Sequence, residues 1–200
     1  MTRNNQGPYK VAVTGGIGSG KSTVLAMIRQ RGYRVLSCDD LAREVTGEPR
    51  VLEALRARFG AEIAGETLDR RALAARVFGD SAALAQLNEI VHAGVFRRLR
   101  EEFAACKEKV IFVEIQLLFE THSEDLFDQI VVVMRGREER IRAVAARNGL
   151  TREEVSARIQ SQFDYENLPK NAHTVIYNDS GLGELEKKVT VLLDDIQAKI

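Results

Sequence analysis

The stretch Gly15-Gly16-Ile17-Gly18-Ser19-Gly20-Lys21-Ser22 limits what this chain can fold into more than any other. It matches G-x-x-x-x-G-K-[ST], the pattern of a loop that wraps around nucleotide phosphates. Residues 9–14 read as a short buried strand before it, and residues 23–30 read as a helix after it. Glycine permits the tight loop because it lacks a Cβ, and the helix points its positive end at the same place. The alternative is a glycine-rich turn that binds nothing, but the strand–loop–helix order favours a purine-nucleotide site.

The residue types in this loop suggest separate tasks. Lys21 supplies a point charge for the β- and γ-phosphates, and the Ser22 hydroxyl is placed to ligate Mg²⁺. Bare backbone N–H groups can approach the phosphate oxygens. The loop residues expected to bind ATP are Gly16, Gly18, Ser19, Gly20, Lys21, Ser22 and Thr23.

Composition restricts the remaining possibilities. The chain has 200 residues, 44% of them hydrophobic, which is enough for one domain with a full core. Its 29 basic and 29 acidic residues cancel, so no global positive field favours nucleic acid. Cys38 and Cys106 lie far apart without metal-ligand spacing, which indicates a reduced, cytoplasmic chain. Without an apolar run of 18 residues or an apolar leader, we expect no membrane span and no signal peptide.

The apolar pattern predicts an α/β fold. A strand, a helix and a second strand within the first 38 residues form a βαβ unit, which implies a parallel sheet. We therefore expect a three-layer P-loop NTPase fold, with a five-stranded parallel sheet and helices on both faces. The four later strands are expected at residues 33–38, 110–114, 129–134 and 174–178.

Two helical blocks interrupt this pattern. Residues 41–106 carry successive helical patterns without a strand signal, and two tandem helices follow the fourth strand at 137–148 and 152–163. Because of this, we expect a helical insertion after the second strand and a second helical block after the fourth strand, on a nucleotide-binding core. The expected boundaries are 9–40, 107–135 and 170–200 for the core, 41–106 for the insertion and 136–169 for the second helical block.

Two carboxylates end predicted strands. Asp39 follows the second strand, and ligands of open α/β sheets bind outside the carboxyl ends of strands. It could accept or orient the proton of an attacking hydroxyl, whereas capping of the next helix by Asp39 or Asp40 is the structural alternative. The two interpretations are compatible if one Asp faces substrate and the other caps. Glu114 ends the third strand, where P-loop proteins place a carboxylate near Mg²⁺, unless it simply points to water.

The second helical block is rich in arginine. Arg137, Arg140 and Arg147 fall within one quadrant of its first helix, while Arg142 points away. Clustered guanidinium groups suit a lid that neutralises transition-state charge on phosphates. The alternative is a solvated face in which neighbouring glutamates pair with the arginines.

Motifs beyond the phosphate loop indicate which class of phosphate-loop protein this chain resembles. A GTPase switch would need D-x-x-G after the third strand and a later N-K-x-D, and the chain has neither. The chain resembles the dephospho-CoA kinase family in motifs that span nearly its whole length. The matching stretches are 13–23, 38–43, 68–73 with Val77-Phe78, Leu87-Asn88 with His92, 117–120, Arg147, Leu150-Thr151, Gln162 and 175–178.

This resemblance implies a three-part enzyme, with a nucleotide-binding core, a helical substrate-binding insertion for CoA at 41–106 and a helical lid at 136–169. It also implies that the enzyme transfers the γ-phosphate of ATP to the ribose 3′-hydroxyl of dephospho-CoA. It places the general base at Asp39, a lid arginine that also binds ATP at Arg147, and substrate-side groups at Arg70 and His92. Expected partners are ATP with Mg²⁺ and dephospho-CoA, without nucleic acid or membrane, for a monomer or small homo-oligomer. The expected catalytic residues are Asp39, Lys21 and Arg147, and the expected substrate-binding residues are Asp39, Arg70, His92 and Glu114.

Some positions depart from the family pattern. Arg140 or Arg142 could stand in for a lid arginine that is missing at position 143. The alternatives left open are another nucleoside or nucleotide kinase of this fold, and a non-catalytic nucleotide-binding regulator. The departures are Ser37 for Asp, Ala93 for Pro, Gln116 for Pro, Ala143 for Arg and His173 for Asp.

Overall fold

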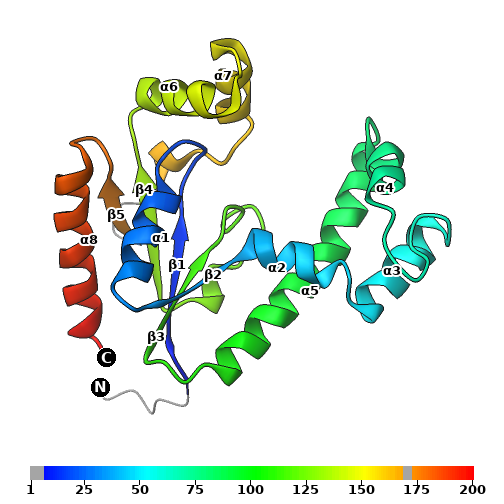
Figure 1. Cartoon of the computed structure of the whole chain (residues 1–200), viewed down its shortest axis with the longest axis horizontal. Helices are drawn as coiled ribbons and strands as arrows, with labels where there is room; N and C mark the ends of the chain where they lie inside the picture. Colours follow the sequence, from blue (N-terminus) through cyan, green and yellow to red (C-terminus); the bar gives the residue numbers. More distant parts are fainter. Residues whose placement is uncertain (1–6, 169–172) are drawn as a thin grey trace. The chain divides into compact units, whose positions relative to one another are not determined.

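The computed structural model describes residues 7–168 and 173–200 of the chain. The predicted end of the lid at Pro169 lies outside these ranges. The chain forms two compact units (Figure 1). The sheet unit comprises Met1–Leu36 and Lys107–Ile200, and the helical unit comprises Ser37–Cys106.

Five strands form one sheet, in the spatial order β2-β3-β1-β4-β5. The central strand β1 pairs in parallel with β3 and β4, and β4 pairs in parallel with β5. The predicted five-stranded parallel sheet with helices on both faces is confirmed. The strands are β1 (Tyr9–Thr14), β2 (Arg34–Ser37), β3 (Val110–Glu114), β4 (Gln129–Met134) and β5 (Thr174–Tyr177).

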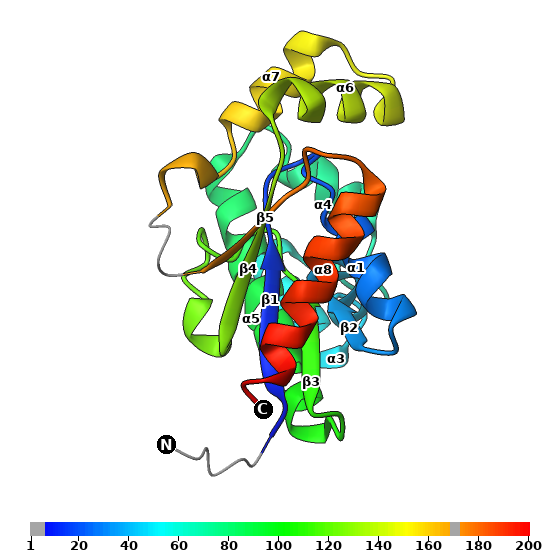
Figure 2. The ribbon, with the colours of Figure 1, turned by 90° about the vertical axis from the view of Figure 1, so that its left-hand side faces the viewer.

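The core of the sheet unit explains why the strand sequences are almost wholly apolar. Val11 and Val13 of β1 are fully buried because neighbouring strands cover both edges and helices cover the faces. Helices α1 (Lys21–Gln30) and α8 (Leu182–Gln197) pack against each other and bury their apolar faces in the same cluster (Figure 2). The carboxyl ends of β1, β3 and β4 therefore meet at one edge of a rigid sheet, where ligands of such folds bind.

Helices α6 (Arg137–Asn148) and α7 (Arg152–Gln160) follow β4. Gly149 ends α6 in the left-handed region, and Thr151 starts α7 in a capping box with Glu154. The predicted extension of α7 to residue 163 is wrong, because Phe163 leaves the helix to stack on Phe119 with ring centroids 4.7 Å apart. We call α6, α7 and the segment to Tyr165 the helical arm.

The helical unit contains α2 (Cys38–Val45), α3 (Pro49–Phe59), α4 (Arg70–Val77) and α5 (Ser81–Ala105). The prediction of a strand to residue 38 and a helix from 41 is wrong. The Ser37 hydroxyl caps α2 by accepting from the Asp40 N–H, so the helix begins at Cys38. Within the described ranges, no helix has the length and apolar content needed to cross a membrane.

Candidate active site

The phosphate loop has the backbone shape that its glycines predict. Gly15 has a φ of +143°, and a Cβ there would collide with the Val133 carbonyl oxygen of β4. Gly20 begins α1 in the left-handed region, and a Cβ there would collide with the Asn178 amide. A side chain at either position would push the loop away from the strand ends, so glycine is required by space as well as by φ.

Lys21 lies inside the loop. Its side chain is 9% exposed, and its Nζ donates to the carbonyl oxygens of Gly15 at 2.6 Å and Gly16 at 3.3 Å. The ammonium group is thereby held against the concave side of the loop. A buried cation in this position attracts anions strongly, because surrounding water screens it little.

A cavity of about 360 Å³ opens in front of this loop. It gathers Lys21 and Ser22 from the loop, Glu114 from the end of β3, and Arg147 from α6. These four predicted site residues, which are up to 126 positions apart in the sequence, thus line one space. The other lining residues are Ile17, Gly18, Ser19, Gly20, Thr23, Gln116, Arg135, Ala143 and Val144.

The donor atoms in this cavity fit one divalent cation of the Mg²⁺ type. The Ser22 hydroxyl and the Glu114 carboxylate are hard oxygen donors, which Mg²⁺ prefers. Within residues 7–168 and 173–200, no group of three or more His, Cys, Asp or Glu side chains could hold a metal ion. Mg²⁺ usually binds proteins through one or two side chains, together with water and the phosphates of the substrate.

The arginines of the arm do not form the single predicted cluster. Arg140 is 8% exposed, and its Nε donates to the Ile17 carbonyl oxygen at 2.9 Å. Arg147 is exposed at the cavity, with its Nε 3.0 Å from Asn148 Oδ1. Arg137 donates to Ser156 of α7 instead. Of the two stand-ins considered for the missing arginine at 143, only Arg140 meets the loop, because Arg142 is 74% exposed and pairs with Glu139.

The sequence analysis assigned no site role to Arg135 or Asn178, although residues 175–178 are one of the stretches that resemble the family. Arg135 lines the first cavity and also a second one of about 220 Å³, which shares Gly20 and Thr23 with the first. Asn178 lines the second cavity and donates from Nδ2 to the Ser19 carbonyl oxygen at 3.0 Å. Both residues directly follow strands, and this position at the carboxyl edge of the sheet was the available signal.

Asp39 lies in the helical unit, in the first turn of α2, and is exposed. Ser37 provides the N-cap, so the alternative that Asp39 or Asp40 caps this helix is wrong. Asp40 instead pairs with Arg43, with 2.6 Å between Oδ1 and Nη1. The departure at Ser37 therefore has a structural task, and the role of Asp39 as a base stays a prediction.

Arg70 and His92 have packing partners within the helical unit. Arg70 donates to the Thr46 hydroxyl at 2.9 Å and to the Arg43 carbonyl oxygen at 3.3 Å, at the end of α2. This contact with the negative end of another helix compensates for its unfavourable place at the start of α4. The ring of His92 lies 6.3 Å from that of Phe96, and burial lowers the pKa of His92. Substrate contacts of both residues stay predictions.

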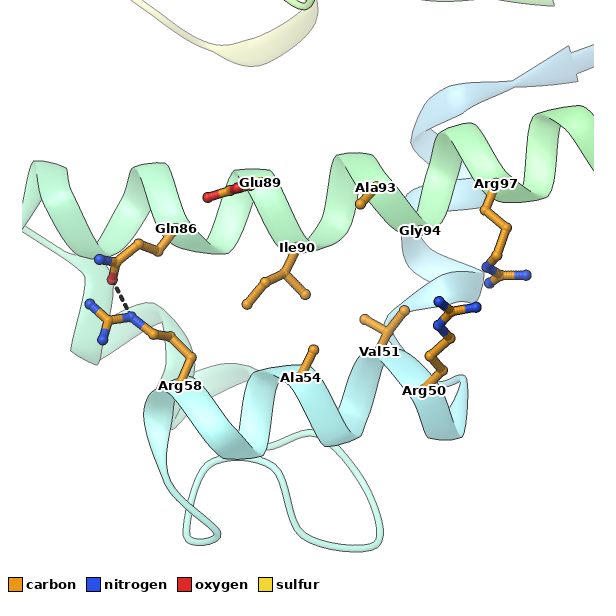
Figure 3. A pocket seen from close by; sticks show the side chains of 10 residues that line it. All are labelled: Arg50, Val51, Ala54, Arg58, Gln86, Glu89, Ile90, Ala93, Gly94 and Arg97. Carbon is orange, nitrogen blue, oxygen red and sulfur yellow. Dashed lines mark hydrogen bonds between the residues drawn. The ribbon is translucent and has the colours of Figure 1, made fainter.

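The helical unit also holds a cavity of about 720 Å³ that no motif indicated (Figure 3). It lies between α3 and α5, with Val51, Ala54 and Ile90 as its apolar walls. Two of its arginines already have partners. Arg58 donates a hydrogen bond to Gln86, and Arg97 forms ion pairs with Glu48 and Glu101. The remaining lining residues are Arg50, Glu89, Ala93 and Gly94.

The lowered pKa of His92 predicts a small loss of stability in acid. The unfolded chain binds the proton at higher pH than the folded chain, so the free energy of unfolding falls as pH decreases through about 6.5. We expect His92→Gln to flatten the fall of the urea midpoint between about pH 7.5 and 5.5, as followed by circular dichroism. The pKa of His173 is lowered in the same direction, so part of the fall should remain. Equal slopes for the wild type and the variant would refute this prediction.

Comparison with known proteins shows the family of this chain. The family model described as dephospho-CoA kinase matches residues 9–184. A dephospho-CoA kinase of Thermus thermophilus is 41% identical over 189 residues, covering 94% of this chain and 92% of that protein. One from Deinococcus radiodurans is 40% identical over 193 residues, covering 95% and 93%.

Solved structures show the same fold. A Thermus thermophilus crystal structure has a TM-score of 0.79 and 41% identity, and covers 94% of this chain and 97% of its own. The dephospho-CoA kinase of Campylobacter jejuni has a TM-score of 0.65, with coverages of 94% and 97%. At 23% identity, this second likeness shows the fold alone.

The parallel sheet, the phosphate loop and the Lys21 ammonium group inside that loop define a P-loop nucleotide-binding fold. The family match makes this chain a P-loop kinase, an enzyme class that transfers phosphoryl groups from nucleotides. Within that class, the chain belongs to the dephospho-CoA kinase family.

Proposed function

We propose that this chain transfers the γ-phosphate of ATP to the ribose 3′-hydroxyl of dephospho-CoA, giving CoA and ADP. The proposal rests mainly on one observation. In a chain of this family, one cavity is lined by Lys21, Ser22, Glu114 and Arg147 together. Phosphoryl transfer requires mainly positioning and charge stabilisation, and these residue types supply both.

ATP is expected to place its phosphates in the first cavity. Loop N–H groups and Lys21 bind the β- and γ-phosphates, and Arg147 adds positive charge from the arm. The second cavity continues from Gly20 and Thr23 toward the segment between β5 and α8, which leaves room for the nucleoside. Arg135, which lines both cavities, would lie between the phosphates and the nucleoside.

Ser22 and Glu114 are the residues proposed to hold Mg²⁺ at this site. When bound with ATP, the ion neutralises charge on the phosphate oxygens. The exposed Ser22 hydroxyl at the start of α1 and the carboxylate at the end of β3 are held by rigid elements. The protein therefore contributes a fixed pair of oxygen donors and leaves the remaining ligands to phosphate and water.

The binding site for dephospho-CoA, which accepts the phosphoryl group, is assigned to the helical unit. Asp39 accepts or orients the proton of the 3′-hydroxyl as the new O–P bond forms. The bond from the γ-phosphorus to its bridging oxygen breaks, and ADP leaves with the electron pair. Arg70 and His92 are proposed as acceptor contacts. In this proposal the helical insertion binds dephospho-CoA and the helical arm acts as the lid of a cytoplasmic enzyme, monomeric or a small homo-oligomer.

An ADP-release assay with a panel of acceptors tests this function. We expect release with ATP, Mg²⁺ and dephospho-CoA, and a kcat/KM at least about 10²-fold lower with nucleosides and nucleoside monophosphates. Preference for one of these other acceptors would make the chain a different small-molecule kinase of this fold. Tight ATP binding without ADP release for any acceptor would instead indicate a nucleotide-binding regulator.

A further inference from the structure

Ile17, at the middle of the phosphate loop, is held by the helical arm at both of its backbone polar groups. Its N–H donates to Gln162 Oε1 at 2.8 Å, and its carbonyl oxygen accepts from Arg140 Nε at 2.9 Å. Gln162 follows α7 and Arg140 belongs to α6, so the two bonds come from different parts of the arm. Both hydrogen bonds are partly buried, so leaving either backbone group unpaired costs free energy, and the two bonds together fix the position of Ile17.

The side chain of Ile17 belongs to the same attachment. It packs against the buried cluster of the arm, which is formed by Ile141, Val144 and Val155. This cluster joins α6 to α7, and Ile17 packs against it from the phosphate loop. Moving the arm away from the loop would therefore expose apolar surface in addition to breaking two hydrogen bonds.

The glycines beside Ile17 allow α6 to approach this closely. A Cβ on Gly16 would collide with the Arg140 guanidinium, and one on Gly18 would lie 2.8 Å from the Arg140 carbonyl oxygen. Their lack of a side chain therefore serves contact with the arm as well as the shape of the loop.

The end of the arm is attached to the strand that feeds the loop. The Tyr165 hydroxyl lies 3.1 Å from Thr14 Oγ1 and 3.2 Å from the Gln116 carbonyl oxygen. Thr14 is the last residue of β1, directly before the loop. Contacts of the arm thus reach both the start and the middle of the phosphate loop.

We propose that Gln162 and Arg140 are positioning residues, which hold the phosphate loop through Ile17 and keep Arg147 of the same arm in line with it. Neither side chain has to touch the reacting atoms for this task. The loop and the arm then bind ATP as one preorganised surface. This lowers the free-energy cost of ordering their side chains and backbone when ATP binds. The kinetic consequence rests on the proposed function, whereas the attachment itself does not.

Hydrogen–deuterium exchange tests the attachment without catalysis. Gln162→Met keeps the approximate volume and removes the acceptor, so we expect the Ile17 amide to exchange roughly tenfold faster. Exchange in α8 should stay unchanged, and the melting temperature should fall by no more than about 5 °C. Gln160→Met, an exposed glutamine two residues earlier, is the matched control and should leave the Ile17 amide as in the wild type. Unchanged exchange at Ile17 in Gln162→Met would overturn the proposal, and so would an equal increase across the whole sheet unit.

Two variants of Arg140 separate positioning from charge. Arg140→Gln retains an N–H donor at the same distance along the side chain but loses the charge, whereas Arg140→Met loses both. We expect Arg140→Met to raise the KM for ATP roughly tenfold with little change in kcat, and Arg140→Gln to restore most of that loss. Equal losses of kcat in both variants would show that the charge acts on the transition state, and would overturn the positioning role. If no acceptor supports ADP release, the Kd for ATP takes the place of KM in this comparison.

Discussion

Lys21→Ala is expected to lower the kcat for ADP release with dephospho-CoA by about 10³-fold or more. The buried ammonium is held against the loop by two carbonyl oxygens, so its charge is preorganised for the phosphates. No other lysine lines this cavity in the described parts of the chain. Without the Lys21 ammonium group, the negative charge that develops on the transferring phosphoryl group is stabilised less. Water compensates poorly for this loss because Lys21 is largely buried.

The control for this variant is Lys187→Ala. Lys187 lies on α8, is largely exposed and pairs with Glu184, so its removal should change kcat by less than about twofold. Melting temperatures of both variants show whether the fold is retained. Full activity of a folded Lys21→Ala protein would contradict the assignment of residues 15–22 as the phosphate site.

Asp39→Asn is expected to reduce kcat by about 10²-fold or more and to leave the Kd for ATP near the wild-type value. The amide has the size of the carboxylate but accepts a proton poorly, so only the step that activates the 3′-hydroxyl should suffer. Asp39 is not among the residues proposed to bind ATP or Mg²⁺, which is why ATP binding should be spared. Turnover from quenched reactions and a titration with a fluorescent ATP analogue measure the two quantities separately.

Asp40→Asn is the matched control, because it removes an equal charge from the next residue of the same helix. Asp40 pairs with exposed Arg43, so its replacement should alter kcat only slightly. If both variants lose turnover equally, charge at the start of α2 matters in general, and Asp39 is not the specific base. An unchanged kcat in Asp39→Asn would remove this residue from the mechanism.

The sheet and the phosphate loop could be predicted from the sequence because their signals are local. The glycines at 15 and 20 are demanded by backbone shape and close approach, and the buried strands are short apolar runs. The predicted start of α2 was wrong because it depends on one side chain. The Ser37 hydroxyl accepts from the Asp40 N–H, so β2 ends at Ser37 and α2 begins at the next residue. A side-chain cap can thus override the apolar pattern over three residues.

The arrangement of the arm could not be predicted, because it depends on contacts between distant segments. Helical periodicity placed Arg137, Arg140 and Arg147 on one side of α6 but could not show what lies opposite each of them. In the structure Arg140 meets Ile17, a residue 123 positions earlier, while Arg137 meets Ser156 of α7. Arg135 escaped notice for a related reason, since only the sheet order shows that the ends of β3 and β4 flank the loop after β1.

The most direct test of the proposed reaction compares dephospho-CoA with its 3′-deoxy analogue as the acceptor. The two molecules differ only in the hydroxyl that is proposed to attack the γ-phosphate. We predict ATP-dependent ADP release together with a product heavier by one phosphoryl group for dephospho-CoA, and neither for the analogue, which should act as an inhibitor. Phosphorylation of both compounds, or of neither, by the folded and ATP-binding protein would contradict transfer to the 3′-hydroxyl.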